Sequence, residues 1–180
     1  MTTFIDEIKQ LGELTEEDRA LLAEMRSAIE EQAPEIVERF YAHLQTFPHL
    51  DAILNAEPGR VERLKGHLKN WLITLADGTY GDAYYERRYR IGKRHVEVGL
   101  EPRYVMGAMA YCRAHAAQMI VETAYADDAQ KAQRAQALNR VMDLDLNIML
   151  QSYDDHRIAQ FLEVTGFSRE LFDNLMAGLG

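Results

Sequence analysis

Apolar residues recur at spacings of three and four along nearly the whole chain, and this pattern constrains the fold more than any other feature. Between Val61 and Leu75, for example, the apolar positions follow the repeat of one helical face. Alternating runs of β-branched residues bounded by turn pairs, which are typical of strands, are absent from the sequence. We therefore predict an all-α fold.

Capping and helix-breaking residues divide this pattern into separate helices. Thr15 followed by three acidic residues is typical of a helix start, and Gly99 with Pro102 beyond it is typical of a helix end. The pattern predicts a helix from Thr15 to about Gln32, one from Pro34 to Pro48, a short piece over Leu50–Leu54, one between Gly59 and Asp77, a basic helix from about Asp82 to Val98, and two long helices over about Arg103–Tyr125 and Ala129–His156. The last helix has an apolar stripe wide enough for burial on two sides, and the amphipathic tail beyond it is interrupted by Gly166.

Length and composition exclude several classes of protein. The chain has 180 residues, which is enough for one domain and a short connector. Its single cysteine, Cys112, permits no internal disulfide, and its N-terminus lacks the pattern of a signal peptide, so we predict a cytoplasmic protein. A net charge of -9 argues against a nucleic-acid partner, and no apolar stretch is long enough to span a membrane.

The six histidines do not form any of the common metal-binding motifs. No glutamate precedes a histidine by three residues, and neither HxxxH nor HExxH occurs. A Gly-rich phosphate loop and a GxSxG motif are also absent. The sequence therefore gives no support to zinc hydrolase or serine hydrolase chemistry.

His95 differs from the other histidines in its surroundings. It shares a helical face with Ile91 and Val98, near the end of the basic helix. Such an imidazole could bind a haem iron while neighbouring cations meet the propionates; the cations nearest in sequence are Arg87, Arg88, Arg90, Lys93 and Arg94. The alternative is a structural histidine bonded to a backbone carbonyl, with the basic run facing solvent.

Two further polar groups lie on apolar faces. His67 is flanked by apolar residues on the helix before the basic one, and 28 residues separate it from His95, so the two imidazoles could lie on opposite sides of a planar ligand. Tyr41 has Phe40 and Leu44 beside it, and its hydroxyl can donate a hydrogen bond into a pocket. Each of them also has a purely structural interpretation as a core residue.

Several motifs, in order, resemble the globin-coupled sensor family. The segment Arg90-Ile91-Gly92-Lys93-Arg94-His95-Val96-Glu97-Val98-Gly99-Leu100-Glu101-Pro102, followed by Tyr104 and Met106-Gly107-Ala108, is similar to the proximal-histidine region of that family. Phe40-Tyr41, the segment from Val61 to Lys65, and Asp143-Leu144-Asp145-Leu146 before Met149 match it as well. The resemblance covers about residues 10 to 158.

The resemblance implies a globin-like helical sandwich around haem b, with an extra N-terminal segment. His95 would be the proximal iron ligand, Tyr41 the distal donor to oxygen, and His67 a possible distal ligand. Leu64 and Leu68 would line the distal pocket. The other expected contacts with the cofactor are Phe40, Leu44, Trp71, Arg88, Ile91, Val98, Tyr104, Met106 and Met149. Many members have a second aromatic residue where this chain has Val105, so the resemblance does not carry over a proximal hydrogen bond from this position.

The same resemblance implies a sensor of O2, with CO and NO as other possible ligands. Residues 1–158 would form the haem sensor domain, and residues 159–180 a connector to an output domain such as a histidine kinase or diguanylate cyclase. The last two core helices would form a homodimeric four-helix bundle. Two other functions stay open from sequence: a self-contained catalytic globin with peroxidase or NO and O2 chemistry, and a non-haem helical dimerisation module. For the leading function we expect this domain alone not to be an enzyme, and the full-length protein to carry a signalling enzyme.

Overall fold

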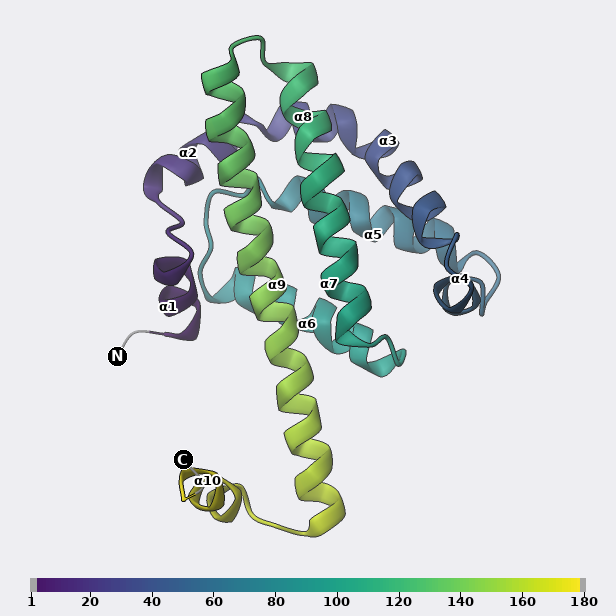
Figure 1. Cartoon of the computed structure of the whole chain (residues 1–180), viewed down its shortest axis with the longest axis vertical. Helices are drawn as coiled ribbons and strands as arrows, with labels where there is room; N and C mark the ends of the chain where they lie inside the picture. The colour runs from purple at the N-terminus through teal and green to yellow at the C-terminus, as the bar shows by residue number, and fades with distance from the viewer. Residues whose placement is uncertain (1–2, 179–180) are drawn as a thin grey trace.

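The computed structural model describes residues 3–178, and all regular secondary structure in this range is helical (Figure 1). The predicted all-α fold class is therefore confirmed. The helices are α1 (Phe4–Leu11), α2 (Glu16–Glu24), α3 (Arg26–Leu44), α4 (Pro48–Leu54), α5 (Arg60–Thr74), α6 (Asp82–Glu97), α7 (Pro102–Tyr111), the π-helical turn η1 (Cys112–Ala116), α8 (Ala117–Ala124), α9 (Asp128–Thr165) and α10 (Arg169–Ala177). No helix in this range is both long and apolar enough to cross a membrane.

The predicted capping residues act as expected at several helix ends. Thr15 and Asp18 form a capping box at the start of α2, in which the Asp18 backbone donates to the Thr15 hydroxyl (3.1 Å) and the Thr15 backbone donates to the Asp18 carboxylate (2.9 Å). Gly99 and Gly166, which follow α6 and α9, have φ of 72° and 69°. A glycine reaches this left-handed region without the steric penalty of a Cβ, so both positions end their helices sharply.

One predicted helix boundary near the N-terminus is wrong. Pro34 was expected to begin a helix, but it lies inside α3, and the break falls at Met25. Pro34 is exposed, so the carbonyl that loses its backbone hydrogen bond can meet water. On the opposite side of α3, Ile29 and Ile36 are both buried, which keeps the helix continuous through the proline.

The two long C-terminal helices also differ from their predicted bounds. The segment expected as one helix over Arg103–Tyr125 is interrupted by η1, a five-residue π-helical turn. Neither glycine nor proline occurs in η1, so nothing in the sequence marked it. Helix α9 continues to Thr165 rather than ending near His156; its 38 residues correspond to about 57 Å, and its last turns project beyond the other helices (Figure 1).

The helices form two layers around one core. Helix α9 and the α7–η1–α8 segment run antiparallel at the front of Figure 1, and α3 and α5 cross behind them. Apolar residues of α9 such as Leu138, Met142 and Ile148 are fully buried between the layers. Leu144 is buried as well, while Leu146 and Leu150 are half-buried, so the wide apolar stripe of α9 is largely covered within one chain.

Helix α6 packs closely against α9 because Gly92 has no side chain. A Cβ at this position would lie 2.6 Å from the Met149 carbonyl oxygen and 2.8 Å from the Met149 Cα, which is closer than real Cβ contacts come. The contact is with backbone, which cannot move aside as a side-chain tip can. Gly92 therefore allows the two helix backbones to touch one turn before His95.

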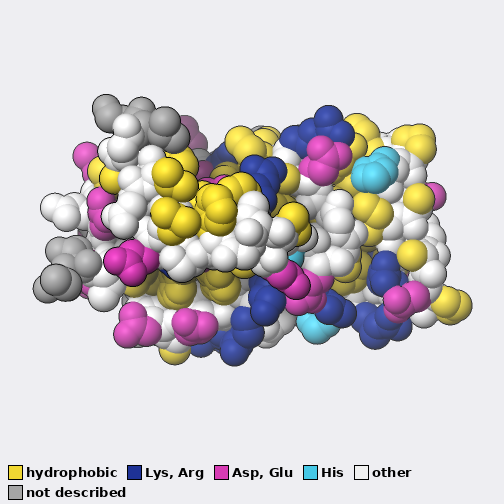
Figure 2. Space-filling model, turned by 90° about the horizontal axis from the view of Figure 1, so that it is seen from below, with side chains coloured by type: hydrophobic (Ala, Val, Ile, Leu, Met, Phe, Trp, Pro, Cys, Tyr) yellow, Lys and Arg dark blue, Asp and Glu magenta, His cyan; other side chains and the backbone are white. Residues whose placement is uncertain are grey.

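The C-terminal segment packs on the projecting end of α9. The ring of Phe161 lies 5.9 Å from that of Phe167 and 5.6 Å from that of Phe172, so α10 folds back on α9 through an aromatic cluster. Figure 2, which views this end of the molecule, shows hydrophobic side chains gathered on it. The large hydrophobic residues exposed in this segment are Phe161, Val164, Phe167, Leu171, Leu175 and Met176.

Candidate functional site

The side chain of His95 provides a neutral imidazole near the end of α6. Its Nδ1 atom is buried and has no hydrogen-bond partner among residues 3–178. Burial lowers the pKa of His95 to about 4, so the ring is neutral at pH 7 and keeps a lone pair on one nitrogen. A neutral imidazole of this kind is a common axial ligand of haem iron. The structural alternative, a ring bonded to a backbone carbonyl, is not what the described residues show.

The surroundings of His95 fit a haem better than a bare metal ion. Within the described part of the chain, no group of three or more His, Cys, Asp or Glu side chains could hold a metal. A porphyrin supplies four nitrogen ligands of its own, so the protein needs to supply one. His95 meets this requirement alone.

The burial of His95 predicts a pH dependence of stability in the protein without cofactor. Unfolding returns the pKa of His95 from about 4 to its ordinary value near 6.5. Between these values the unfolded chain binds a proton that the folded chain does not, so stability falls as pH is lowered from 6.5 to 4, by roughly 3 kcal/mol in total. Urea unfolding at several pH values checks this. The His95→Gln variant should lose this part of the slope, and an equal slope in both proteins would contradict it.

Tyr41 on α3 has the properties of a pocket donor. It is 7% exposed, and its ring packs edge-on against Phe40 with centroids 5.4 Å apart. Its hydroxyl makes no hydrogen bond to any described residue. Burial, with a smaller contribution from nearby Cys112, raises the pKa of Tyr41 well above its ordinary value, so the hydroxyl keeps its proton. Leu44, one turn further along, is half-buried.

Helix α5 contributes two apolar residues and one exposed histidine. Leu64 and Leu68 are half-buried and pack against the core. His67 was predicted to lie on the same apolar side, but it is exposed. The reason is the angular position of residue 67, which falls beside the stripe of Leu64, Leu68 and Trp71 rather than at its centre.

The prediction that Arg88 contacts the cofactor needs correction. Its guanidinium is 3% exposed, and its Nε lies 2.7 Å from a carboxylate oxygen of Asp145. It also donates to the Thr74 hydroxyl (3.0 Å) and to the Tyr84 hydroxyl (3.2 Å). The indole N–H of Trp71, another predicted contact, donates to the same Asp145 (2.7 Å). Arg88 is therefore bound inside the protein and has no freedom to reach a propionate.

The rest of the basic run divides into paired and free cations. Arg87 pairs with Asp77 at 3.0 Å and Arg94 with Glu97 at 2.6 Å. Arg90 and Lys93 are exposed, and neither has an acidic partner within residues 3–178. They are the cations of α6 that are available to an anionic ligand.

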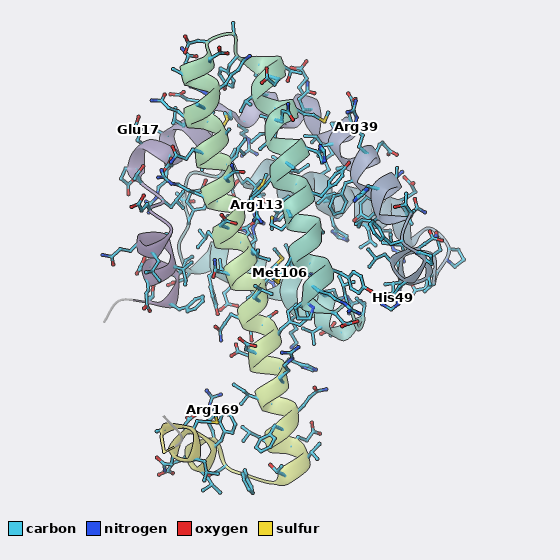
Figure 3. All side chains as sticks on the ribbon, in the orientation of Figure 1. Glu17, Arg39, His49, Met106, Arg113 and Arg169 are labelled. Carbon is cyan, nitrogen blue, oxygen red and sulfur yellow. The ribbon has the colours of Figure 1, made fainter. Side chains whose placement is uncertain are left out.

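Apolar residues close to His95 in sequence are unusually exposed. Val98, one turn after His95, is 38% exposed, and Met106 on α7, beside α9 in Figure 3, is 50% exposed. Ile91 is half-buried. A bound planar apolar group would cover these side chains. The other predicted contacts are more enclosed: Phe40 and Met149 are buried, and Tyr104 is half-buried with its ring 5.3 Å from that of His49.

A hollow that sequence reasoning did not anticipate lies between α3 and the η1–α8 segment. Arg39, Tyr111, His115 and Met119 line it. Tyr111 stacks on His43, and both His43 and His115 have their ring centroids 4.4 Å from that of Tyr111. His95 is not part of its lining, but Phe40 is, so this hollow borders the candidate site at one of the predicted cofactor contacts.

Sequence reasoning missed Tyr84, and it noted Asp145 only as part of a family motif without assigning it a role. Asp145 is fully buried in the middle of α9. A signal was present, because this acidic residue falls within the apolar stripe formed by Met142, Ile148 and Met149. A buried carboxylate requires partners, and the basic run of α6 supplied one.

A layered helical fold with a neutral, unpaired histidine on its sixth helix defines a protein of the globin type. A model of the Protoglobin family matches residues 3–159, which is most of the chain, and the chain belongs to this family. The globin domain of a Geobacter sulfurreducens globin-coupled sensor is similar in structure, with a TM-score of 0.77 and 30% sequence identity. That match covers 85% of this chain and 99% of the Geobacter domain.

Two further relatives extend the comparison. The globin domain of E. coli DosC, in a ferric crystal form, shares the fold with a TM-score of 0.68 at 18% identity, over 82% of this chain and 97% of that domain. The heme-based aerotactic transducer HemAT of Halobacterium salinarum is 25% identical over 162 residues, which are 90% of this chain. The chain spans about a third of the length of that transducer, since the match covers 33% of it. The resemblance to globin-coupled sensors predicted from the motifs is confirmed.

Proposed function

We propose that this chain is a haem-based gas sensor domain with oxygen as its ligand. The observation that carries the proposal is His95, a neutral imidazole with a buried, unpartnered nitrogen in a member of the Protoglobin family. Haem b, when bound, supplies an iron with one position open to a diatomic gas. The names of the relatives, a haem-based transducer and a globin-coupled sensor, support a signalling role.

The residues of the site have distinct tasks in this proposal. His95 would hold the iron, and the Tyr41 hydroxyl, which makes no hydrogen bond within residues 3–178, would donate one to the gas. Leu64 and Leu68 form the apolar wall beside the gas. Phe40, Leu44, Trp71, Ile91, Val98, Tyr104, Met106 and Met149 enclose the porphyrin. Because Arg88 is bound to Asp145, Arg90 and Lys93 would be the residues that pair with the haem propionates.

Replacing Tyr41 with phenylalanine should make oxygen dissociate faster. The phenyl ring keeps the packing with Phe40 but cannot donate a hydrogen bond. A hydrogen bond to a partly charged group contributes about 1.5–3 kcal/mol, so the dissociation rate should rise by about 10- to 150-fold. Stopped-flow measurement of oxygen release checks this. Dissociation of CO, a poor acceptor, is the internal control and should change much less. An unaltered oxygen dissociation rate would show that Tyr41 is not the donor.

His67 admits two resting states, and one variant distinguishes them. His67 could supply a second ligand to the iron if α5 moved inward; otherwise it would stay exposed, as in this structure. We expect direct ligation to give a low-spin ferric spectrum that His67→Ala converts to high spin. Absorption spectra of both proteins measure this. An unchanged low-spin fraction in His67→Ala would exclude ligation by His67.

Signal output would use the C-terminal helices. We place the sensor domain in residues 1–158 and a connector in residues 159–180, leading to an output domain such as a histidine kinase or diguanylate cyclase. A cytoplasmic homodimer formed through the α7–α8 and α9 helices would carry the change, because a helix pair that has two arrangements can pass a local shift to a distant domain.

Absorption spectra of the purified protein in ferric, ferrous and oxygenated forms test the proposal. A haem spectrum with reversible binding of oxygen is the expected result. Protein that stays colourless after supplementation with haem would instead indicate a non-haem helical dimerisation module. Turnover of peroxide or of NO by the isolated chain would indicate a catalytic globin, and CO and NO titrations establish the order of ligand preference.

A further inference from the structure

The carboxylate of Asp145 is the central group of a buried polar network. Its Oδ1 accepts a hydrogen bond from the Tyr84 hydroxyl (2.5 Å). Its Oδ2 accepts one from the indole N–H of Trp71 (2.7 Å) and lies 2.7 Å from Nε of Arg88. Asp145 is 0% exposed, so neither oxygen meets water and each of these contacts is made in a low-dielectric interior.

The partners of Asp145 come from the two helices that flank the candidate site. Trp71 belongs to α5, while Tyr84 and Arg88 belong to α6. Arg88 also donates to Thr74 of α5 (3.0 Å), so the two helices are joined to each other as well as to α9. One carboxylate on α9 thus fixes the spacing of α5 and α6.

These attachment points lie close to the residues that would face the cofactor. Leu68 is one turn before Trp71 on α5, and His95 is two turns after Arg88 on α6. Between Arg88 and His95, Gly92 holds α6 against the backbone of Met149. A displacement of either helix is therefore transferred to α9 over a distance of one or two turns.

Stability alone does not explain such a network. A buried ion pair gains little over well-packed apolar residues, because desolvation offsets the attraction between the charges. The hydrogen bonds and the ion pair of the Asp145 network are directional, however, so they define one arrangement of α5, α6 and α9.

We propose that Asp145 is a positioning residue that sets the separation between the distal wall on α5 and the proximal wall on α6, and that makes α9 respond to a change in that separation. This inference rests on the proposed haem function. It assigns α9 a direct connection to both sides of the pocket.

The test compares Asp145→Asn with Asp154→Asn, which alters an exposed residue of the same helix. In the haem-loaded ferrous protein, Asp145→Asn should shift the iron–histidine stretching band and change the oxygen dissociation rate by about two- to thirtyfold, the range found for residues that couple sites without contacting ligand. Asp154→Asn should change neither. A purely structural role would lower the unfolding midpoint of Asp145→Asn and leave both signals as in wild type, which would overturn the proposal.

A second variant tests the proposal in case Asp145→Asn folds poorly. The pair Arg88→Met with Asp145→Leu replaces both charges by apolar groups and should restore much of the stability. We expect the band shift and the altered dissociation rate to persist in this double variant. If stability and both signals return to wild-type values together, Asp145 has no positioning role.

A measurement without haem separates this proposal from the proposed function. Nitroxide labels on cysteines introduced at exposed Lys69 of α5 and Lys93 of α6 report the separation of the two helices. The distance distribution should broaden or shift in Asp145→Asn and remain unchanged in Asp154→Asn. Failure of the wild type to bind haem would refute the proposed function alone, whereas an unchanged distance distribution in Asp145→Asn would refute the positioning role.

Discussion

Replacing His95 with glycine is expected to weaken haem binding by at least about a hundredfold, since loss of a residue that merely supports a metal ligand already costs 10- to 100-fold. The reason is that, in the proposed function, His95 would supply the protein's bond to iron, and no cluster of metal-binding side chains within residues 3–178 would provide a substitute. Haem transfer to an excess of apomyoglobin, followed by absorption, measures the change. The ferrous spectrum of any residual complex should also lose its imidazole signature.

Two controls make this result specific to the iron bond. His115→Gly alters an exposed histidine on η1, remote in sequence from α6, and should retain haem as the wild type does. Free imidazole should enter the space left in His95→Gly and restore the five-coordinate ferrous spectrum. A variant at His95 with wild-type haem affinity and spectrum would remove the central claim about this site.

The sequence was sufficient to predict the fold class and many helix ends, because those features are local. The capping box at Thr15 and the left-handed glycines at Gly99 and Gly166 depend on a few neighbouring residues. The family motif around His95 could also be recognised from sequence, because most of its residues are consecutive in one helix. The break at Met25 and the π-helical turn η1 were missed because packing between distant helices, rather than a local residue type, decides them.

The contrast between local and long-range features also explains why Arg88 and His67 lie in surroundings that the sequence did not predict. Arg88 and its neighbours are indistinguishable as cations in the sequence, and the buried acid that separates Arg88 from the others lies 57 residues away on α9. His67 differs from Leu64 and Leu68 by a rotation around the α5 axis that the apolar pattern did not resolve. A single sequence therefore does not determine which distant charges pair or how each helix is rotated about its axis.

Replacing Arg88 with methionine is expected to destabilise the protein without cofactor by about 3–5 kcal/mol. Methionine keeps an apolar chain of similar length but leaves the Asp145 carboxylate buried without its cation, and breaking a buried pair on one side has this cost. The free energy of unfolding from urea titration at pH 7 measures it. Arg90→Met, at an exposed position two residues further along the same helix, should stay within about 0.5 kcal/mol of the wild type.

The pH dependence of that loss identifies the unpaired carboxylate as its cause. Burial raises the pKa of Asp145, and the charge of Arg88 opposes the rise. In Arg88→Met this opposition is gone, so the pKa of Asp145 rises further above its unfolded value of about 3.9. Between these two values the folded variant binds a proton that the unfolded chain lacks, so the contribution of Asp145 to stability is greatest at low pH and falls as pH increases. The deficit relative to wild type should therefore be smaller at pH 5 than at pH 8. A deficit that is equal at both values would indicate lost packing around the methionine instead of an uncompensated charge on Asp145.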